Sequence, residues 1–457
     1  MRLVHSHSRF RVFEYNPFVK GETGSTIGLL SNLTSVSRLS LANAPFLLSN
    51  DTQLKLISHN KMTMILSMTN AAFLVVVFAL WTENCTSFST HNRQSRYILS
   101  LSAALVQDPT FTTPDTSTID EVACKDTASR MKRVLVSVSS DVSPSQTVGI
   151  SYVHWPAEGK KTSNLPLILL HGFDSSCLEY RRLGSKLATR GVDTYAVDLL
   201  GWGFTQLEGV ASFSAASKVE ALESFAKTEL KGTPFAVAGA SLGGASAIEL
   251  ASANPGLCAA LILIDAQGFV DGVGPMAALP KPIAQLGVQV LKSIPLRQSA
   301  NKMSYFDPAT FATNDAMRIG RLHCTREGWS DALVSFMLSG GFSPSQKVSK
   351  IEAPSLVVWG RQDGILNGNE FANKFVETLP RAQLRWIEEC GHVPHLEKPD
   401  ETADVIAEFL TSNALQTDPT GDSERARDGA FPFVAVGAGI VGAAAVAAAT
   451  LLELSLP

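Results

Sequence analysis

The 457-residue chain lacks the features of several functional classes. Its six cysteines are scattered, and no two of them form a CxxC pair, which argues against a zinc ribbon or a thioredoxin-type site. Lys and Arg number 38 against 42 Asp and Glu, and the basic residues form no cluster. Nucleic acid is therefore not an expected partner, because phosphate binding needs concentrated positive charge. Nothing in the cysteine pattern demands an oxidising compartment.

The N-terminal part of the chain has little acidic charge and no clear hydrophobic period. Residues 1–60 are rich in Ser, Asn and Leu, as disordered or presequence segments are. Residues 71–81 are apolar (AAFLVVVFALW), and their length fits the core of a signal peptide better than a membrane span. Residues 88–107 contain no Asp or Glu, which is typical of a transit peptide. We expect residues 1–107 to be presequence or disordered.

The order of these N-terminal segments carries information about location. A signal peptide followed by a transit-like segment that starts at Phe88 resembles the bipartite presequence of diatoms and related algae with complex plastids. The resemblance covers residues 62–107 and implies a plastid protein. An uncleaved N-terminal membrane anchor and plain secretion stay open as alternatives.

Residues 130–412 show short apolar runs that alternate with helical stretches. Several runs are continuously apolar, as strands buried on both faces should be. Repeated strand–helix units predict an α/β fold with a mostly parallel, eight-stranded sheet and helices on both faces. The expected strands are Arg133–Val138, Val148–His154, Leu165–Leu170, Asp193–Asp198, Phe235–Ala238, Ala260–Asp265, Ser355–Trp359 and Gln383–Ile387. The expected helices are Cys177–Arg190, Ser214–Leu230, Leu242–Ala253, Asn367–Leu379 and Pro399–Ser412.

Three further segments interrupt or follow this rhythm. Residues 267–346 combine several prolines with amphipathic stretches, which predicts an inserted helical lid. Residues 413–430 form a polar linker, and the uncharged run 431–452 would span about 33 Å as a helix, enough for a membrane anchor. Large lid side chains are expected either to shape an apolar substrate pocket or to form the core of the lid. They are Phe306, Phe311, Trp329, Phe336 and Met337.

The motif with the clearest chemical meaning is GxSxG at residues 239–243. It directly follows an apolar strand and directly precedes a helix, so Ser241 would lie at a sharp turn and project into a cleft. Gly239 and Gly243 leave room for the backbone to cross closely there. The helix N-terminus directs its amide dipoles to the place where negative charge develops. We expect Ser241 to be a nucleophile.

Two backbone N–H groups near this turn are candidates for an oxyanion hole. One belongs to Phe173 in the segment His171-Gly172-Phe173-Asp174, which follows a predicted strand. The other belongs to Leu242, directly after the nucleophile. His171 itself is expected to be a structural, hydrogen-bonding residue.

An acid and a base follow the serine in the chain. Asp363 lies in the turn after the strand Ser355–Trp359, where a carboxylate can orient an imidazole. His392 lies between the last predicted strand and the last helix, and it can take a proton from the serine and return it to a leaving group. Asp265 is a competing acid and His395 a competing base. The predicted triad is Ser241, Asp363 and His392.

These segments together resemble a known family. The stretches His171–Tyr180 and Asp198–Phe204 are similar to plastid-type α/β-hydrolases of plants and algae, and the resemblance covers residues 133–412 apart from the lid. It implies the α/β-hydrolase fold, with Asp198–Gly203 as a loop that supports the cleft. Relatives with an aspartate nucleophile, such as epoxide hydrolases and haloalkane dehalogenases, are disfavoured because Ser241 occupies that position.

The predicted activity is hydrolysis of an ester or thioester of an apolar, lipid-like substrate, without a metal or an organic cofactor. The triad alone leaves a lyase or a C–C bond hydrolase open. A His395–Asp400 pair in an HxxxxD pattern leaves an acyltransferase open as well. A ligand-binding member of the fold without catalytic activity is a further alternative.

Overall fold

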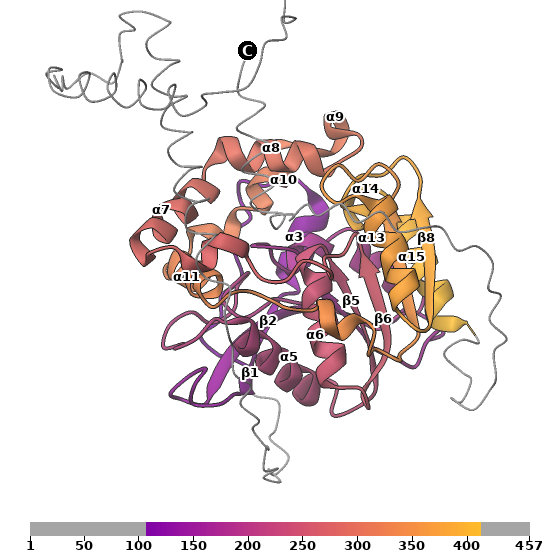
Figure 1. Ribbon diagram of the computed structural model, residues 1–457, viewed down its shortest axis with the longest axis horizontal. Coiled ribbons are helices and arrows are strands. Elements are labelled where there is room, and N and C mark those ends of the chain that lie inside the picture. Colours follow the sequence, from indigo (N-terminus) through magenta and orange to yellow (C-terminus); the bar gives the residue numbers. More distant parts are fainter. Residues whose placement is uncertain (1–106, 413–457) are drawn as a thin grey trace, which may run out of the picture. The chain divides into compact units, whose positions relative to one another are not determined.

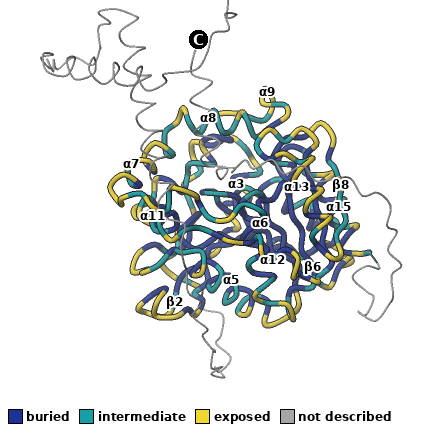
Figure 2. Tube along the Cα trace, in the orientation of Figure 1, coloured by how far each residue is buried: buried dark blue, intermediate teal, exposed yellow. Residues whose placement is uncertain are grey.

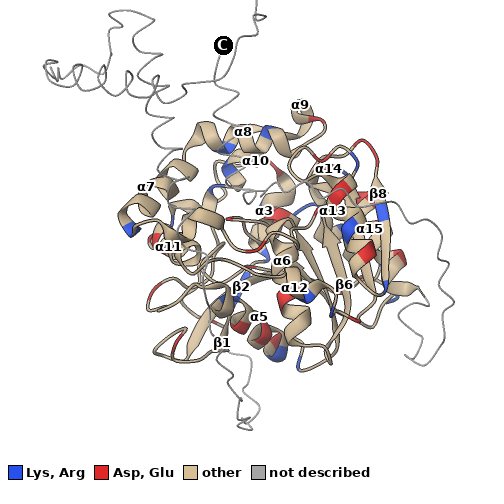
Figure 3. Cartoon of the chain, in the orientation of Figure 1, with Lys and Arg blue, Asp and Glu red and all other residues tan. Residues whose placement is uncertain are grey.

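The structure, a computed structural model, describes residues 107–412. The predicted presequence up to residue 106, the linker and the apolar run 431–452 lie outside the described residues. Within the described part, no helix has both the length and the apolar character needed to cross a membrane. Lys and Arg are interspersed with Asp and Glu over this part of the chain (Figure 3).

An eight-stranded sheet forms the centre of the fold, in the order β1-β2-β4-β3-β5-β6-β7-β8 (Figure 1). Its strands are β1 (Lys132–Ser137), β2 (Thr147–Trp155), β3 (Leu167–Leu170), β4 (Thr194–Val197), β5 (Phe235–Ala240), β6 (Cys258–Ile264), β7 (Ser355–Gly360) and β8 (Ala382–Ile387). The pairs β1–β2 and β2–β4 are antiparallel, and the remaining five pairs are parallel. The predicted α/β class and mostly parallel sheet are confirmed.

Helices cover both faces of the sheet because successive strand residues face two different apolar cores. In β3, Ile168 and Leu170 belong to one core and Leu167 and Leu169 to the other. The first core is covered by α5 (Ala215–Glu229), α6 (Leu242–Ala253) and α13 (Gly368–Thr378). The second is covered by α3 (Val122–Ser129), α4 (Leu183–Thr189) and α15 (Pro399–Thr411). Figure 2 shows the strands as the buried centre of the trace.

The folded part of the chain begins earlier than the apolar pattern indicated. Helix α3 and the residues before it are part of the fold, because Ile119, Cys124 and Ala128 lie in the second core. The fold therefore includes residues well before position 130, where the sequence pattern placed its start. The helix is only 8 residues long, and three of them are buried, so it leaves little periodic signal in the sequence.

The stretch expected as one helix, Cys177–Arg190, is two elements. The first is η1 (Cys177–Tyr180), a 3₁₀ turn, and the second is α4. The Tyr180 hydroxyl donates to the Leu170 carbonyl at 2.7 Å, and the Cys177 N–H donates to Asp198 Oδ1 at 2.6 Å. These bonds hold η1 against the end of the sheet, so the chain changes direction before α4 begins.

Between β6 and β7 the chain leaves the sheet and forms a lid of short helices at one end of the fold (Figure 1). The lid elements are η2 (Gly274–Ala278), α7 (Lys281–Leu291), α8 (Ile294–Ser304), α9 (Pro308–Phe311), α10 (Asn314–Ile319), η3 (Leu322–Thr325), α11 (Trp329–Leu338) and α12 (Ser345–Val348). Helix α11 anchors the lid, because the Phe336 ring packs edge-on against Trp202 at 4.9 Å between centroids. A last short helix, α14 (Pro394–Glu397), precedes α15.

Replacement of Phe336 by alanine tests this anchoring. The side chain is 0% exposed, so Phe336→Ala should lower the free energy of unfolding by about 3–5 kcal/mol through lost burial and a residual cavity. Phe306→Ala is the matched control, because that ring is 48% exposed and should contribute less than about 0.5 kcal/mol. Urea unfolding measures both values. Equal losses of unfolding free energy in the two variants would show that packing of Phe336 does not anchor the lid.

Candidate active site

Ser241 lies at a strained turn between β5 and α6. Its φ of 52° and ψ of −121° fall in a backbone region that residues other than glycine rarely adopt. The turn packs directly on β3, since a Cβ on Gly243 would lie 2.1 Å from the Leu170 carbonyl oxygen. Only glycine fits at this position without a shift of the backbone. The turn presents Ser241 at the carboxyl end of the parallel strands, where its side chain lines a cavity.

Asp363 and His392 come from the loops after β7 and β8. His392 Nδ1 lies 2.8 Å from Asp363 Oδ2, and both side chains are buried. The other carboxylate oxygen accepts the backbone N–H groups of Ile365 at 2.7 Å and Leu366 at 3.0 Å. Burial alone would raise the pKa of Asp363, but His392 and these N–H groups lower it. The carboxylate is therefore charged and holds the imidazole by Nδ1.

The two loops meet through a close contact of their backbones. A Cβ on Gly360 would lie only 1.9 Å from the Gly391 carbonyl oxygen, so a side chain at this position would separate the loops. The Gly391 N–H donates to Glu397 Oε2 at 2.7 Å, which fixes the loop that carries His392. Gly360, Gly391 and Glu397 were not predicted as site residues, because their partners lie in another segment of the chain.

Asp265, the competing acid, lies beside this pair without a hydrogen bond to His392. One carboxyl oxygen accepts the Gly360 N–H at 3.0 Å, and the other has no hydrogen-bond partner in the described part of the chain. Burial and the nearby charge of Asp363 both raise the pKa of Asp265. The geometry thus favours Asp363 as the partner of His392, while the surroundings of Asp265 disfavour its charged form.

A cavity of about 280 Å³ lies between Ser241 and the lid, and His392 also lines it. Within the described residues no hydrogen bond joins Ser241 to His392. Such bonds often form or tighten only when a substrate is bound. The lining is mostly apolar and comes from the body of the fold and from the lid. Its larger apolar members include Phe173, Leu291, Leu296, Ile319, Ile365 and Leu396.

The interpretation of the large lid side chains as a substrate pocket is wrong. Trp329, Phe336 and Met337 are buried in the first core, Phe306 is exposed, and Phe311 lies outside the cavity lining. Helix α11 turns its apolar face toward the body of the fold, where large rings lose the most contact with water. Smaller aliphatic side chains of α7 and α8 face the cavity instead.

The two predicted oxyanion donors lie beside Ser241. Gly172, the neighbour of Phe173, comes so close that a Cβ on it would lie 3.5 Å from the Ser241 Cβ. Leu242 is the first residue of α6, so its N–H has no partner within the helix. Neither the Phe173 nor the Leu242 N–H donates to another group of residues 107–412. Both N–H groups are therefore without a partner in this part of the chain, as donors of an oxyanion hole need to be.

The other two histidines of the predicted site make structural contacts. His171 Nδ1 lies 2.9 Å from the Gly172 carbonyl oxygen, and its Nε2 accepts the Leu199 N–H at 3.1 Å. Burial lowers the pKa of His171, which keeps the ring neutral. His395 is fully buried, with Nε2 at 3.1 Å from Glu179 Oε1. Neither ring lines the cavity.

The HxxxxD pair does not form a site, so the acyltransferase interpretation of this motif is wrong. Asp400 lies at the surface at the start of α15, where its carboxylate pairs with Lys186 at 2.9 Å. His395 is buried against Glu179 on the inner side of α14. The two residues thus make separate structural contacts, His395 in α14 and Asp400 in α15.

Among residues 107–412, two groups of three side chains could in principle offer ligand atoms to a metal. They are Asp265 with Asp363 and His392, and Asp174 with His323 and Cys324. In the second group, the protein's own donors already occupy the Asp174 carboxylate. In the first group, Asp363 is taken by His392 and two backbone N–H groups. We assign no metal to either group.

The fold thus places a strained serine after β5, an aspartate after β7 and a histidine after β8. The sequence model of the alpha/beta hydrolase family matches residues 167–405, from β3 into α15. The chain belongs to this family. The match includes the segments that carry Ser241, Asp363 and His392.

Three relatives show what this chain is similar to. It is 39% identical over 246 residues to the alpha/beta hydrolase domain-containing protein VTE7 of Arabidopsis thaliana, which covers 54% of this chain and 74% of that protein. Lipase 1 of Psychrobacter immobilis is 26% identical over 261 residues, with coverage of 55% and 79%. A 2-hydroxy-6-oxononadienedioate/2-hydroxy-6-oxononatrienedioate hydrolase of Burkholderia vietnamiensis is 28% identical over 274 residues, with coverage of 56% and 90%. This member of the alpha/beta hydrolase family is accordingly an enzyme of the hydrolase type.

The geometry separates the roles of the two aspartates. Asp363→Asn should lower kcat by about 10³–10⁴-fold, because an amide cannot stabilise the imidazolium and favours the wrong imidazole tautomer. Asp265→Asn should cost less than about 10-fold, because His392 is paired with Asp363 and an amide keeps the shape of the Asp265 carboxyl group. Steady-state kinetics with a chromogenic ester measures both. A larger loss of kcat for Asp265→Asn than for Asp363→Asn would show that Asp265, after β6, is the acid of the site.

Proposed function

We propose that this hydrolase cleaves carboxylic esters through a covalent acyl-enzyme on Ser241. The observation that carries the proposal is the His392–Asp363 hydrogen bond of 2.8 Å, made at the edge of a cavity that Ser241 also lines. An acid paired with an imidazole beside a serine hydroxyl supports this mechanism, because proton transfer from serine requires these three groups in that order. The fold alone would not distinguish this reaction from others on the same framework.

The reaction proceeds in two halves. In the first, Ser241 Oγ attacks the ester carbonyl carbon while His392 Nε2 takes its proton, and Asp363 stabilises the imidazolium. The N–H groups of Phe173 and Leu242 bind the oxyanion, and His392 then protonates the departing alcohol. In the second half, water attacks the acyl carbon and gives a proton to His392. Ser241 leaves with that proton, and the free acid is released.

The cavity favours an apolar acyl group. Its wall is mainly aliphatic, and about 280 Å³ is near the small end of the range for ligand pockets. An acyl chain or a small apolar ester therefore fits better than a bulky polar substrate. The similarity to Lipase 1 of Psychrobacter immobilis supports a lipid ester in particular.

Hydrolysis of a C–C bond is the second candidate, because the Burkholderia relative is named for a dioate substrate. A substrate with two carboxylates needs cations in the cavity wall. The Arg and Lys side chains that line the cavity in the described part are Arg181 and Arg297. Arg181 pairs with Glu121 at 3.0 Å, and Arg297 pairs with Asp174. Because both are already neutralised, we favour the ester.

A third element of the proposal concerns location. The segment 62–107 has the composition of a bipartite targeting sequence, and the run 431–452 has the length and lack of charge of a membrane anchor. Both lie outside the described residues. We propose that the enzyme enters a plastid and acts on lipid at an internal membrane.

The central test of the activity is a panel of p-nitrophenyl and glycerol esters with acyl chains of increasing length, together with a vinylogous diketone acid. Wild-type protein should hydrolyse the esters and leave the diketone acid unchanged. Folded Ser241→Ala should lose about 10⁴–10⁶-fold in kcat. Product analysis by mass spectrometry identifies the bond that breaks. Preferred cleavage of the diketone acid would support the C–C candidate, and turnover by Ser241→Ala would exclude the nucleophile.

Location is tested with the full chain and a truncation after residue 430, each expressed with a C-terminal tag in an alga with complex plastids. Both forms should reach the plastid, because they share the presequence. After carbonate extraction, only the full chain should stay with the membranes. Secretion of both forms would contradict the targeting proposal. Equal extraction of the two forms would contradict the anchor.

A further inference from the structure

The loop that carries Phe173, one of the two proposed oxyanion donors, also contains a buried carboxylate. Asp174 directly follows Phe173, is 1% exposed, and has a φ of 46°, in the left-handed region that non-glycine residues rarely adopt. A buried carboxylate is strongly destabilising unless charged groups and hydrogen-bond donors surround it. The identity of its partners therefore shows what holds this part of the loop in place.

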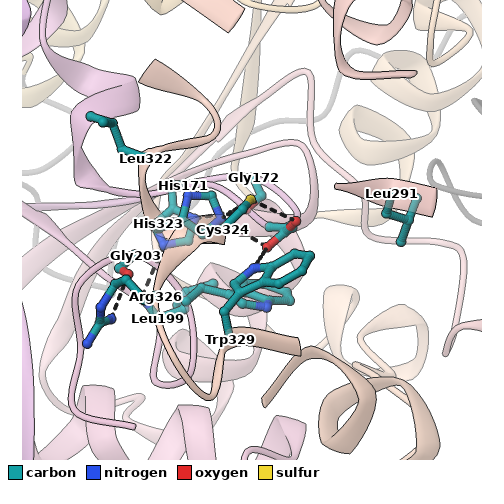
Figure 4. Close-up of polar contacts among 12 residues, drawn as sticks. His171, Gly172, Leu199, Gly203, Leu291, Leu322, His323, Cys324, Arg326 and Trp329 are labelled. Carbon is teal, nitrogen blue, oxygen red and sulfur yellow. Dashed lines mark hydrogen bonds and ion pairs between the residues drawn. The ribbon is translucent and has the colours of Figure 1, made fainter. Parts of the chain in front are cut away.

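Every side chain that donates to the Asp174 carboxylate within the described fold comes from the lid. His323 Nε2 lies 3.0 Å and Trp329 Nε1 2.8 Å from Oδ1. The Arg297 guanidinium pairs with Oδ2, and its Nη1 donates to the Asp174 backbone carbonyl at 3.3 Å. These residues belong to η3, α11 and α8, so three lid elements converge on one carboxylate. Figure 4 shows His323, Cys324 and Trp329 pointing toward one another at this place.

The charges in this cluster are complementary. Burial alone would raise the pKa of Asp174, but Arg297 and His323 hold it well below its usual range. Burial would lower the pKa of His323, while the sulfur of Cys324 and the Asp174 carboxylate raise it to about 9. Near neutral pH the cluster is thus a carboxylate between two cations. Separation of the lid from Asp174 would leave these charges without partners, so the contact strongly favours a seated lid.

The opposite end of the loop is held by the body of the fold. The Gly172 N–H donates to Glu179 Oε2 at 3.2 Å, and Glu179 in turn lies against His395. Phe173 therefore lies between two anchored neighbours, Gly172 on the body and Asp174 on the lid. The direction of the Phe173 N–H depends on both anchors, because it is set by the backbone dihedrals between them.

We propose that Asp174 is a positioning residue that couples the lid to the oxyanion hole. With the lid seated, the carboxylate holds the backbone so that the Phe173 N–H points at the developing oxyanion. With the lid lifted, the loop is released and that donor is lost. The inference rests on the proposed function, since it assigns Phe173 to oxyanion binding. Alignment matters here because a hydrogen bond weakens steeply when its angle departs from linear.

Three variants separate this role from general support of the lid. Asp174→Asn keeps the shape of the side chain and removes its charge. Arg297→Lys keeps the charge of the partner but not the two-pronged geometry. Arg326→Ala is the matched control, because Arg326 also joins the lid to the body, through the carbonyls of Gly203 at 2.9 Å and Thr205 at 2.8 Å. Within residues 107–412 its side chain has no hydrogen bond or ion pair to residues 171–174, so Arg326→Ala removes lid contacts and leaves the partners of Asp174 in place.

The measurements are steady-state kinetics on a small soluble ester and the inhibition constant of a trifluoromethyl ketone, whose serine adduct carries an oxyanion. For Asp174→Asn we expect kcat to fall by about 10–100-fold with KM within about 3-fold, because the lost interaction acts in the transition state. Binding of the ketone should weaken by the same factor as kcat/KM. Arg297→Lys should show a smaller loss of the same kind, and Arg326→Ala should stay within about 3-fold of wild type on all three measurements.

The outcomes are distinguishable. Equal losses in Arg326→Ala and Asp174→Asn, or a loss confined to KM, would overturn the coupling and leave Asp174 a lid support. Unchanged kcat and ketone binding in Asp174→Asn would overturn it as well. A melting curve is recorded for each variant, and if Asp174→Asn does not fold, the comparison of Arg297→Lys with Arg326→Ala decides in the same way. A wild-type enzyme that neither cleaves esters nor binds the ketone would refute the proposed function itself.

Discussion

The site depends on one close approach of backbones, at the turn where β5 becomes α6. Strand β5 lies beside β3 in parallel register, with Leu170 opposite Gly239, and the turn at Ser241 packs against the end of β3. Gly243 makes this contact with β3 possible, and Gly239 lets the strand approach Gly243 within the turn. The neighbouring backbones then constrain Ser241 to its unusual dihedrals. The loop with Phe173 leaves the same end of β3. Nucleophile and oxyanion donor are therefore set by the same contact.

The parallel order of the strands brings the remaining groups to this point. Strands β6, β7 and β8 follow β5 side by side, so the loops that carry Asp265, Asp363 and His392 emerge at the same edge of the sheet. Three aspartates near the site differ in the groups that surround their carboxylates. Asp363 is charged because His392 and backbone N–H groups outweigh its burial, and Asp174 is charged because the lid supplies two cations. Asp265 accepts the Gly360 N–H but has no ion-pair partner among the described residues, and burial together with the nearby charge of Asp363 raises its pKa.

The sequence predicted those features of the enzyme that depend on residues close together in the chain. Eight apolar runs predicted the eight strands, and the GxSxG turn placed Ser241 between β5 and α6. Asp363 and His392 could be named from their positions after strands, and the structure places them 2.8 Å apart. A family resemblance in the segment 171–204 pointed to the same fold.

Contacts between segments that lie far apart in the chain could not be predicted from such local patterns. The sequence left open whether Trp329 and Phe336 line a pocket or form a core, because the direction in which α11 faces is set by packing of Phe336 on Trp202. No role for Asp174 could be predicted, since its partners lie more than 100 positions further along the chain. Helix α3 was missed because it gains its stability from the core and not from a strong pattern of its own.

The central claim is that Ser241 forms a covalent intermediate, and a mechanism-based label tests it most directly. The folded protein is treated with a fluorophosphonate, and the modified peptide is identified by mass spectrometry. We predict one phosphonyl group per chain, on the peptide that contains Ser241, with strong protection by a competing ester. A wild-type protein that is folded and stays unlabelled, or is labelled at a different residue, would contradict the account.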